Sequence, residues 1–521
     1  MKEKFDVIIV GSGIAGLTAG IQLKKAGYEI AILTKNGEIE ESNTYYAQGG
    51  IIARKEGDSP QKLADDINRA GCNYNNTEAV TVLSNEGPDL VFDFLINEVG
   101  MVFSRNSNGQ MDYTEEAAHS ERRILHFEDH TGENIEKSLT AYAKKIGVKF
   151  YTRHTAIDLI TNNHHSKDCQ ELYKEREVMG LYVLDNKSGK VKIFFSYNVI
   201  LATGGLGNLY QYTTNPSSAT GDGISMAYRA GADIINAEFI QFHPTALFHK
   251  DIKRFLISES LRGEGAKLID KNGSMFMHKY SQLNELAPRD VVARAIYEEM
   301  NKLGCEYMFL DIANHYKGEK PISERFSRIY ETCLSGGIDI TEQPIPIVPA
   351  SHYFCGGIKV DTYGRTSINN LFAIGEVSCT GLHGANRLAS VSLLEGLLWA
   401  KRSADYIMNN FIKISPSRFN EIPEWKSPQN TVDFEPLLIY QDWKAIKLTM
   451  WNYAGIIRTK RGLERALSDL NYYMHRIFKF YKEARLTVDI IELRNAVVTA
   501  QIIVDSAIHN EISIGCHYIK D

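Results

Sequence analysis

The N-terminal segment alternates between apolar runs of strand length and an apolar pattern of helical spacing. Residues 5–10 form a continuous apolar run, apolar residues recur at helical spacing over 17–25, and a second apolar run covers 29–33. The turn after the first run is Gly11-Ser12-Gly13-Ile14-Ala15-Gly16. Strand, glycine-rich turn, helix and strand in this order form the βαβ unit that binds dinucleotides, with the helix N-terminus facing a pyrophosphate. We favour this interpretation over an ordinary strand-to-helix turn.

One position departs from the usual nucleotide-binding pattern. An acidic residue is expected roughly 20 residues after the glycines, at the end of the second strand, where it would bind a ribose hydroxyl. Thr34-Lys35 stands there instead. The sequence therefore argues against simple NAD binding.

Two later apolar runs, 198–202 and 370–374, also end in glycine turns and are predicted to join the same doubly wound sheet. The residues between them must then include an inserted domain. After the proline-containing linker around Ser415-Pro416 and 423–428, helical periodicity covers 456–476 and 487–510. We predict a discontinuous Rossmann-like α/β domain (1–244 and 348–412), an α+β capping domain (245–347) and a C-terminal helical bundle (424–521).

Composition narrows the possible functions. A net charge of -6 and a pI near 6.2 give no general attraction for nucleic acid, and no run of eighteen apolar residues or signal-peptide pattern is present, so we expect a cytoplasmic protein without membrane contact. The seven cysteines are scattered, without the C-x-x-C spacing of metal or redox sites. The polar stretch 162–176 contains His164-His165, which could indicate a metal, but without nearby partner ligands a solvated loop is expected.

Several longer motifs extend over nearly the whole chain. They are Asn43-Thr44-Tyr45-Tyr46-Ala47-Gln48-Gly49-Gly50, Thr220-Gly221-Asp222-Gly223, Gln241-Phe242-His243-Pro244-Thr245, residues 258–265, Pro288-Arg289-Asp290, His352-Tyr353 and residues 384–390. With them the chain resembles the flavoprotein subunits of succinate dehydrogenase and fumarate reductase, and more closely the L-aspartate oxidase family.

The resemblance implies FAD bound in an extended conformation across the first domain. Respiratory members attach FAD covalently to a histidine, and Asn43 at the aligned position has no nucleophilic ring nitrogen, so non-covalent FAD is expected. The residues that the resemblance assigns to the cofactor are Gly11, Ser12, Gly13, Ile14, Ala15, Gly16, Lys35, Asn43, Thr44, Tyr45, Tyr46, Ala47, Gln48, Gly49, Gly50, Ala156, Ile157, Asp222, Glu376, Ser392 and Leu393.

A dicarboxylate substrate is implied by the same resemblance, because planar guanidiniums suit carboxylates. Glu116, in Thr114-Glu115-Glu116, aligns with the glutamate that meets a substrate amino group, with Glu115 as the alternative alignment. The other substrate residues are His243, Ser258, His352, Arg387 and Ser390. Arg289, served by Glu259 and Arg262, is the proton-transfer candidate, as a base or only as an electrostatic clamp.

The expected activity is FAD-dependent oxidation of L-aspartate to iminoaspartate, with oxygen (giving hydrogen peroxide) or fumarate as electron acceptor, as the first step of NAD biosynthesis through quinolinate. A monomer or homodimer that hands its product to quinolinate synthase fits the family. The alternatives are a fumarate reductase or succinate dehydrogenase flavoprotein, and a flavoprotein associated with RNA. Two departures from the family are Ile514, where an arginine is usual, and Ala117-Ala118, where two glycines are usual.

Overall fold

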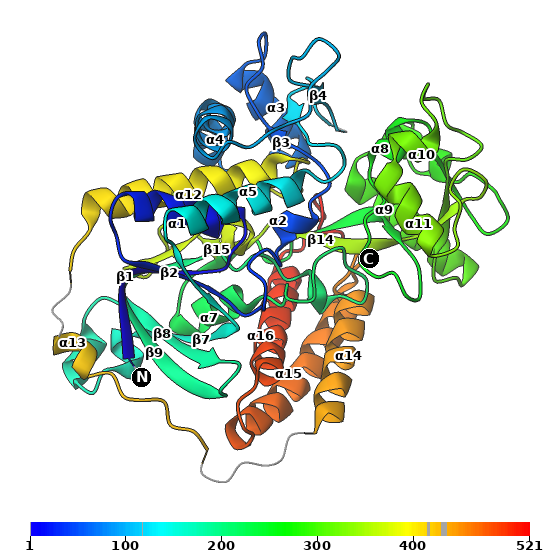
Figure 1. Ribbon diagram of the computed structural model, residues 1–521. Coiled ribbons are helices and arrows are strands. Elements are labelled where there is room, and N and C mark those ends of the chain that lie inside the picture. Colours follow the sequence, from blue (N-terminus) through cyan, green and yellow to red (C-terminus); the bar gives the residue numbers. More distant parts are fainter. Residues whose placement is uncertain (1, 117, 414–416, 429–434, 521) are drawn as a thin grey trace.

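The computed structural model describes residues 2–116, 118–413, 417–428 and 435–520. Among them a seven-stranded sheet in the order β6-β2-β1-β9-β8-β7, with β16 also paired to β9, occupies the left-hand half of the molecule in the view of Figure 1. The pairs β6–β2, β2–β1, β1–β9 and β9–β16 are parallel, whereas β7, β8 and β9 form an antiparallel meander. The strands are β1 (Lys2–Val10), β2 (Ile30–Thr34), β6 (Lys149–Thr152), β7 (His154–Thr161), β8 (Val178–Asp185), β9 (Lys190–Leu201) and β16 (Leu371–Ala373).

The predicted βαβ unit is present at the N-terminus. The continuous apolar run of β1 is that of a strand covered on both faces, and α1 (Ile14–Lys25) and α12 (Val391–Asn410) pack together above the sheet, with α5 (Thr131–Lys145) beside α1 (Figure 1). The predicted strand over 198–202 lies within β9 apart from its last residue, and the one over 370–374 extends one residue beyond β16 at each end. The α/β class predicted from the pattern is therefore confirmed.

The inserted region is built on an antiparallel pair. β11 (Ile240–Leu247) pairs with β14 (Ile345–Phe354), and β13 (Met308–Asp311) and β12 (Lys267–Ile269) extend the sheet. The predicted boundaries at 244/245 and 347/348 fall inside these two strands, so continuous strands connect the inserted region to the cofactor domain. Its helices are α8 (Ser260–Gly263), α9 (Arg289–Leu303), α10 (Ile322–Arg325) and α11 (Ser327–Ser335) (Figure 1).

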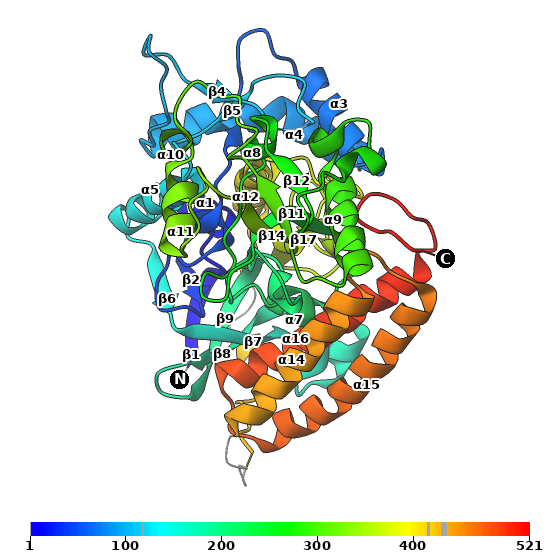
Figure 2. The same ribbon diagram turned by 90° about the vertical axis from the view of Figure 1, so that its right-hand side faces the viewer.

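Three long helices form the C-terminal bundle: α14 (Pro436–Tyr453), α15 (Lys460–Glu483) and α16 (Val488–His509) (Figure 2). The sequence pattern predicted only the last two and began α15 at 456. α14 was missed because its apolar residues do not keep to one face, and Leu437 and Tyr440 are exposed. Thr459 caps α15 through its side chain, which places the helix start at Lys460.

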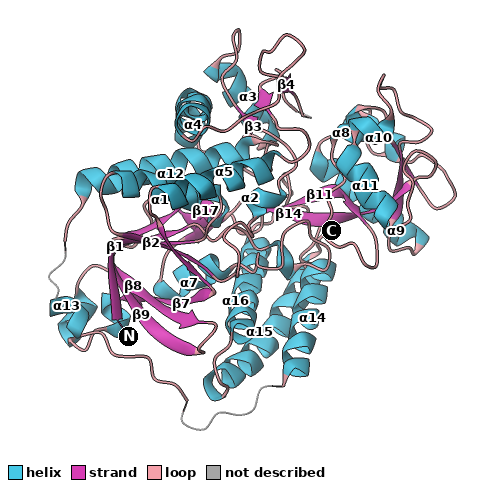
Figure 3. Cartoon of the chain, viewed as in Figure 1, coloured by secondary structure: helices cyan, strands magenta, loops and turns pink. Residues whose placement is uncertain are grey.

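A smaller layer lies above the sheet (Figure 3). Helices α3 (Pro60–Ala70) and α4 (Thr77–Leu90) pack together there, next to the short strands β3 (Ile51–Ile52), β4 (Tyr113–Thr114) and β5 (Ile124–Leu125). The segment between β4 and β5 carries Glu116. The remaining elements are α2 (Asn43–Tyr46), α6 (Asn162–His165), α7 (Asp222–Ala230), β10 (Ile234–Ile235), β15 (Gly357–Lys359), β17 (Ser378–Cys379), α13 (Ser417–Asn420), a π-helix (Val91–Glu98) and the 3-10 turns Cys169–Tyr173, Gly207–Leu209, Met277–Lys279, Asn284–Leu286 and Gly375–Val377.

The polar stretch 162–176 is more ordered than a solvated loop, because it contains α6 and a 3-10 turn. His165 accepts a hydrogen bond from the Thr161 amide and packs against Tyr182, which accounts for it without a metal. Within the described ranges no group of three or more His, Cys, Asp or Glu side chains could hold a metal ion, and no helix is long and apolar enough to cross a membrane. Ser415-Pro416 of the predicted linker lie outside the described residues.

Candidate active site

One deep cleft runs along the carboxyl ends of the parallel strands, at the place where doubly wound folds bind ligands. Most of the residues that the resemblance assigns to FAD line this cleft, together with five of the residues assigned to substrate or proton transfer. Those five are Glu116, Arg289, His352, Arg387 and Ser390. The structure thus brings residues from four distant stretches of the chain to one place.

The glycine-rich turn has the geometry of a phosphate cradle. A Cβ on Gly11 would lie 2.1 Å from the Ala202 carbonyl oxygen, and Gly11 has φ +114°, so only glycine fits. The N-cap of α1 is Gly13, which has no side chain to bind the amides of the first turn. The Ile14 amide donates to Thr44 Oγ1 at 3.1 Å, and the other amides of this turn and the positive end of the helix dipole are suited to an anionic ligand.

Lys35 lies at the distal end of the cleft in a buried ion-pair cluster. Its Nζ is 2.6 Å from Asp222 Oδ2 and 2.5 Å from Glu492 Oε1, and Asn495 donates to the other oxygen of Asp222 at 2.8 Å. Burial opposes the charge, but the two carboxylates raise the pKa of Lys35. Asp222 from α7 and Glu492 from α16 thus bring two carboxylates to the lysine that follows β2.

Asn43 and Glu376 meet across the cleft. The Asn43 side-chain amide donates to Glu376 Oε2 at 2.9 Å, and the Phe354 backbone amide donates to Glu376 Oε1 at 3.0 Å. Burial raises the pKa of Glu376 to about 7. A Cβ on Gly205 would lie 2.2 Å from Glu376 Oε1, so glycine is required there for the carboxyl to reach the cleft.

Three residues assigned to FAD are not among the described residues that line the cleft: Gly16, Tyr45 and Ile157. Gly16 packs behind the turn, where a Cβ would lie 2.1 Å from the Gly11 carbonyl oxygen. The Tyr45 ring is turned toward Lys137, whose Nζ lies 6.0 Å from its centroid. Ile157 is fully buried in a core cluster beside β8 and β9, and its carbonyl accepts hydrogen bonds from two arginines. Their roles stay predictions, and any contact with FAD would need their backbone.

The residues predicted for proton transfer form one buried cluster. Arg289 Nε donates to Glu259 Oε2 at 2.6 Å, and Arg262 Nη2 lies 2.9 Å from Glu259 Oε1. Burial opposes ionisation, but the two guanidiniums lower the pKa of Glu259 to about 2. Burial also disfavours the charge of Arg289, which Glu259 and Glu116 more than offset, so its pKa is raised. Among the described residues, Arg289 Nη1 is buried without a hydrogen-bond partner.

His243 and His352 lie side by side, with ring centroids 5.3 Å apart. Burial and the nearby arginines hold the pKa of both imidazoles well below the usual value, so both rings are neutral. The Thr245 amide donates to His243 Nδ1 at 3.2 Å. The neutral His243 ring therefore carries its proton on Nε2, from which it can donate to a carboxylate.

Arg387 is held from three sides. Its Nη1 donates to Ser392 Oγ at 2.7 Å, its Nε donates to Gln241 Oε1 at 3.3 Å, and its guanidinium carbon lies 4.5 Å from the centre of the Tyr353 ring. A guanidinium fixed in this way loses little conformational freedom when it binds a carboxylate. Ser392, which the resemblance assigns to FAD, is thus hydrogen-bonded directly to Arg387, which it assigns to the substrate.

Glu116 reaches the cleft, whereas Glu115 is exposed. Ser390 donates from its hydroxyl to Glu116 Oε2 at 2.8 Å. The structure therefore favours Glu116 over the alternative alignment. Ala118 has φ +70°, a conformation that favours glycine. Ala117 lies outside the described residues.

Four residues assigned to substrate or proton transfer, His243, Ser258, Glu259 and Arg262, do not line the cleft within the described ranges. The Ser258 hydroxyl accepts a hydrogen bond from the Ser260 hydroxyl at 2.9 Å. Glu259 and Arg262 lie behind Arg289, with Glu259 paired to both arginines. Ile514, the departure near the C-terminus, packs against the apolar cluster of Phe239, Tyr353, Cys355 and Ala385.

Sequence reasoning missed several residues of the cleft. Arg254 and Arg328 from the inserted region and Asn215 from the cofactor domain line it, and Glu492 and Asn495 of α16 support it. No local spacing could have indicated them, because each reaches the site through tertiary packing.

Comparison with known proteins agrees with this geometry. The family model "FAD binding domain" matches residues 6–393, and "Fumarate reductase flavoprotein C-term" matches residues 443–521. The chain is 43% identical to an L-aspartate oxidase of Yersinia pestis, covering 99% of this chain and 96% of that protein. It is 37% identical to a chloroplastic L-aspartate oxidase of Oryza sativa, covering 99% and 81%.

Among solved structures, an E. coli quinol fumarate reductase variant matches with a TM-score of 0.85 and 26% identity, covering 100% of this chain and 92% of that one. A Mycobacterium smegmatis Sdh1 complex matches with a TM-score of 0.80 and 27% identity, covering 99% and 89%. The predicted capping and C-terminal helical architecture agrees with these neighbours.

Proposed function

The chain belongs to the L-aspartate oxidase family of FAD-binding flavoproteins, and from that premise we propose that it oxidises L-aspartate to iminoaspartate. FAD is its cofactor. Oxygen, giving hydrogen peroxide, or fumarate would accept the electrons, and the product would supply quinolinate for NAD biosynthesis. The observation that carries the proposal is the Glu116 carboxylate beside Ser390, in a site otherwise built for anions.

The residues of the cleft fit FAD. The first turn of α1, whose N-cap Gly13 has no side chain, suits the pyrophosphate, and the Lys35–Asp222 pair and Glu376 offer polar groups on either side of it. Bound FAD would supply a flavin ring that accepts a hydride from the substrate C2 atom. Because Asn43 cannot form the covalent link of the respiratory enzymes, we propose that FAD is held non-covalently.

Charge balance supports an amino dicarboxylate. Three guanidiniums, of Arg262, Arg289 and Arg387, and two carboxylates, of Glu259 and Glu116, gather at this end of the cleft, while His243 and His352 are neutral. This leaves one surplus positive charge. L-aspartate carries one net negative charge near pH 7 and would balance it, whereas succinate carries two and has no ammonium to meet the Glu116 carboxylate.

Each side chain then has a defined task. Arg387 and the Arg289 Nη1 atom, which has no hydrogen-bond partner among the described residues, would bind the substrate carboxylates. His352 in the cleft wall and His243 beside it would donate neutral hydrogen bonds. Glu116 would hold the ammonium and lies where the proton released on imine formation can be taken up. A fully protonated Arg289 is an electrostatic clamp during oxidation, and it can donate a proton when fumarate is reduced.

The test is anaerobic mixing of the purified holoenzyme with L-aspartate, with succinate as the parallel sample, while flavin absorbance is recorded. Bleaching by L-aspartate alone, reversed by air with formation of hydrogen peroxide, is expected. Bleaching by succinate alone would instead favour the respiratory alternative. The absence of bleaching by either would refute the proposal.

We further propose a cytoplasmic enzyme, monomeric or homodimeric, that hands its product to quinolinate synthase. The family supports this proposal. It is tested by measuring the mass of the holoenzyme in solution and by co-elution with quinolinate synthase.

A further inference from the structure

The segment that carries Glu116 has little regular structure of its own. Between β4 and β5 the His119 amide donates to the Glu116 carbonyl oxygen at 3.2 Å, which closes a turn of which Glu116, Ala118 and His119 are described. Ala118 in this turn has φ +70°, which costs a residue with a side chain roughly 1–2 kcal/mol. Contacts from outside the turn must therefore hold it in this conformation.

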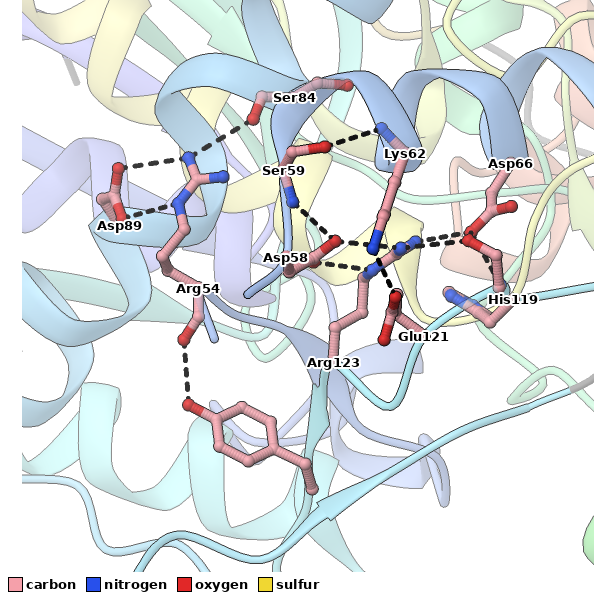
Figure 4. Close-up of polar contacts among 12 residues, drawn as sticks. Arg54, Asp58, Ser59, Lys62, Asp66, Ser84, Asp89, His119, Glu121 and Arg123 are labelled. Atoms are coloured by element: carbon pink, nitrogen blue, oxygen red, sulfur yellow. Dashed lines mark hydrogen bonds and ion pairs between the residues drawn. The ribbon is translucent and has the colours of Figure 1, made fainter. Parts of the chain in front are cut away.

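The main contact comes from Asp66 on α3. Asp66 Oδ2 accepts hydrogen bonds from the Ser120 amide and the Ser120 hydroxyl, both at 2.8 Å, and from Arg123 Nη1 at 2.6 Å (Figure 4). Asp66 is 1% exposed and Arg123 is fully buried. One carboxylate oxygen thus fixes both the backbone and the side chain of the residue that follows His119.

Arg123 is itself fixed by a second carboxylate. Its Nε donates to Asp58 Oδ2 at 2.8 Å, and its Nη2 donates to Asp58 Oδ1 at 3.2 Å (Figure 4). Burial opposes ionisation of Asp66, but the hydrogen bonds of Ser120 and the charge of Arg123 lower its pKa, so it stays charged. Arg69 also pairs with Asp66 and donates to the Ala118 carbonyl oxygen at 3.2 Å.

The other side of the turn is tied to the substrate-binding motif. His119 Nε2 lies 3.1 Å from the Ala389 carbonyl oxygen, and Ser390 donates to Glu116 Oε2 at 2.8 Å. Ser120, which Asp66 binds, is therefore only four positions along the chain from Glu116. A shift of Ser120 would move Glu116 relative to Ser390.

We propose that Asp66, clamped by Arg123, is a positioning residue that fixes the Glu116 carboxylate and so sets the preference for a dicarboxylate with an α-ammonium over one without. This rests on the proposed function, because it assumes that Glu116 meets an ammonium. A purely structural role for Asp66 would instead affect all ligands alike.

The test compares two ligands in the holoenzyme variants Asp66→Asn and Ser120→Ala. For L-aspartate we expect kcat/KM to fall roughly tenfold to a hundredfold in Asp66→Asn, because small misplacements of binding groups have effects of this size. The dissociation constant of succinate, measured by its perturbation of the flavin spectrum, should change less than about threefold. Ser120→Ala, which leaves the Asp66–Arg123 pair intact, should show the same selective loss to a smaller degree.

Asp89→Asn is the control for the loss of a carboxylate in this layer, because Asp89 on the neighbouring helix α4 pairs with Arg54 but is more exposed than Asp66 and does not contact the turn (Figure 4). It should behave as the wild type. Equal losses for L-aspartate and succinate in Asp66→Asn, or no loss, would overturn the proposal. If Asp66→Asn does not accumulate with FAD, Ser120→Ala provides the test: kcat/KM for L-aspartate should fall more than succinate binding weakens. A wild-type enzyme that L-aspartate fails to reduce would refute the proposed function before any variant is made.

Discussion

Ser390 donates a hydrogen bond of 2.8 Å from its hydroxyl to Glu116 Oε2, although the two residues are 274 positions apart. Ser390 lies directly before α12, in the motif that also contains Arg387, whereas Glu116 belongs to the small layer above the sheet. The pair thus joins the part of the site suited to carboxylates to the part suited to an ammonium. Substrate preference should depend on this junction.

Glu116→Gln should reduce kcat/KM for L-aspartate by about 10–100-fold, since a hydrogen bond to a charged group contributes about 1.5–3 kcal/mol. Succinate and fumarate should bind as well as before or more tightly, because a negative charge has been removed. Steady-state kinetics and flavin titrations measure both effects. Glu115→Gln is the control, since Glu115 is exposed. A parallel loss for succinate would exclude Glu116 as the ammonium partner.

Arg289→Leu should lower kcat by at least about 10²–10³-fold, the loss typical when one charge-stabilising donor is removed from an active site. FAD should stay bound, because the partners of Arg289 lie on the substrate side of the cleft. The flavin spectrum and the turnover rate test the two statements separately. Arg325→Leu, at an exposed pair with Glu264, serves as control. Turnover within tenfold of the wild type would contradict the role given to Arg289.

The sequence predicted what depends on short-range patterns. The turn at Gly11–Gly16 and its flanking elements were correctly placed, because apolar runs and glycines determine such units locally. The contact of Glu492 with Lys35 could not be predicted, since it depends on how α16 packs against the sheet. Helix α14 was missed for a related reason. Leu437 and Tyr440 are exposed, so its apolar residues do not form the single stripe that identifies a surface helix.

The residues of the site show the same limit. Motif resemblance named Arg289, Arg387 and Glu116, and all three line the cleft. It gave no indication that Asp66, paired with Arg123, binds Ser120 close to Glu116, because neither Asp66 nor Arg123 belongs to a motif. It also could not separate residues that face the cleft from those directly behind them, such as Gly16 and Glu259.

Lys35→Met should weaken FAD binding by about 10–100-fold. Without the ammonium, Asp222 and Glu492 remain as two buried carboxylates without their counter-ion, which is strongly unfavourable. FAD affinity is measured by titrating the apoprotein and following flavin fluorescence. Lys25→Met, at an exposed pair with Glu98, should have no effect.

The double variant Lys35→Met/Glu492→Gln separates two roles of Lys35. If Lys35 binds FAD itself, thermal stability should recover in the double variant while FAD affinity stays low. Recovery of both would mean that Lys35 only neutralises the two carboxylates.

His517 should make the C-terminal segment sensitive to acid. Its Nδ1 accepts a hydrogen bond from the buried Arg458 at 2.7 Å, and its Nε2 lies 2.7 Å from the Asn510 carbonyl oxygen, so the neutral ring satisfies both contacts. Burial and the charge of Arg458 lower the pKa of His517 to about 4. A lowered pKa means that the unfolded chain takes up a proton near pH 6.5 while the folded chain does not.

Stability from this residue is therefore complete above pH 6.5 and is lost as the pH falls toward 4, by about 2 kcal/mol between pH 7 and pH 5. His517→Gln can accept from Arg458 and donate to Asn510 without titrating, so hydrogen exchange over residues 510–520 should depend less on pH in this variant. His509→Gln, at an exposed position on α16, should keep the wild-type dependence. If His517→Gln loses protection at pH 5 as steeply as the wild type, another group controls the segment.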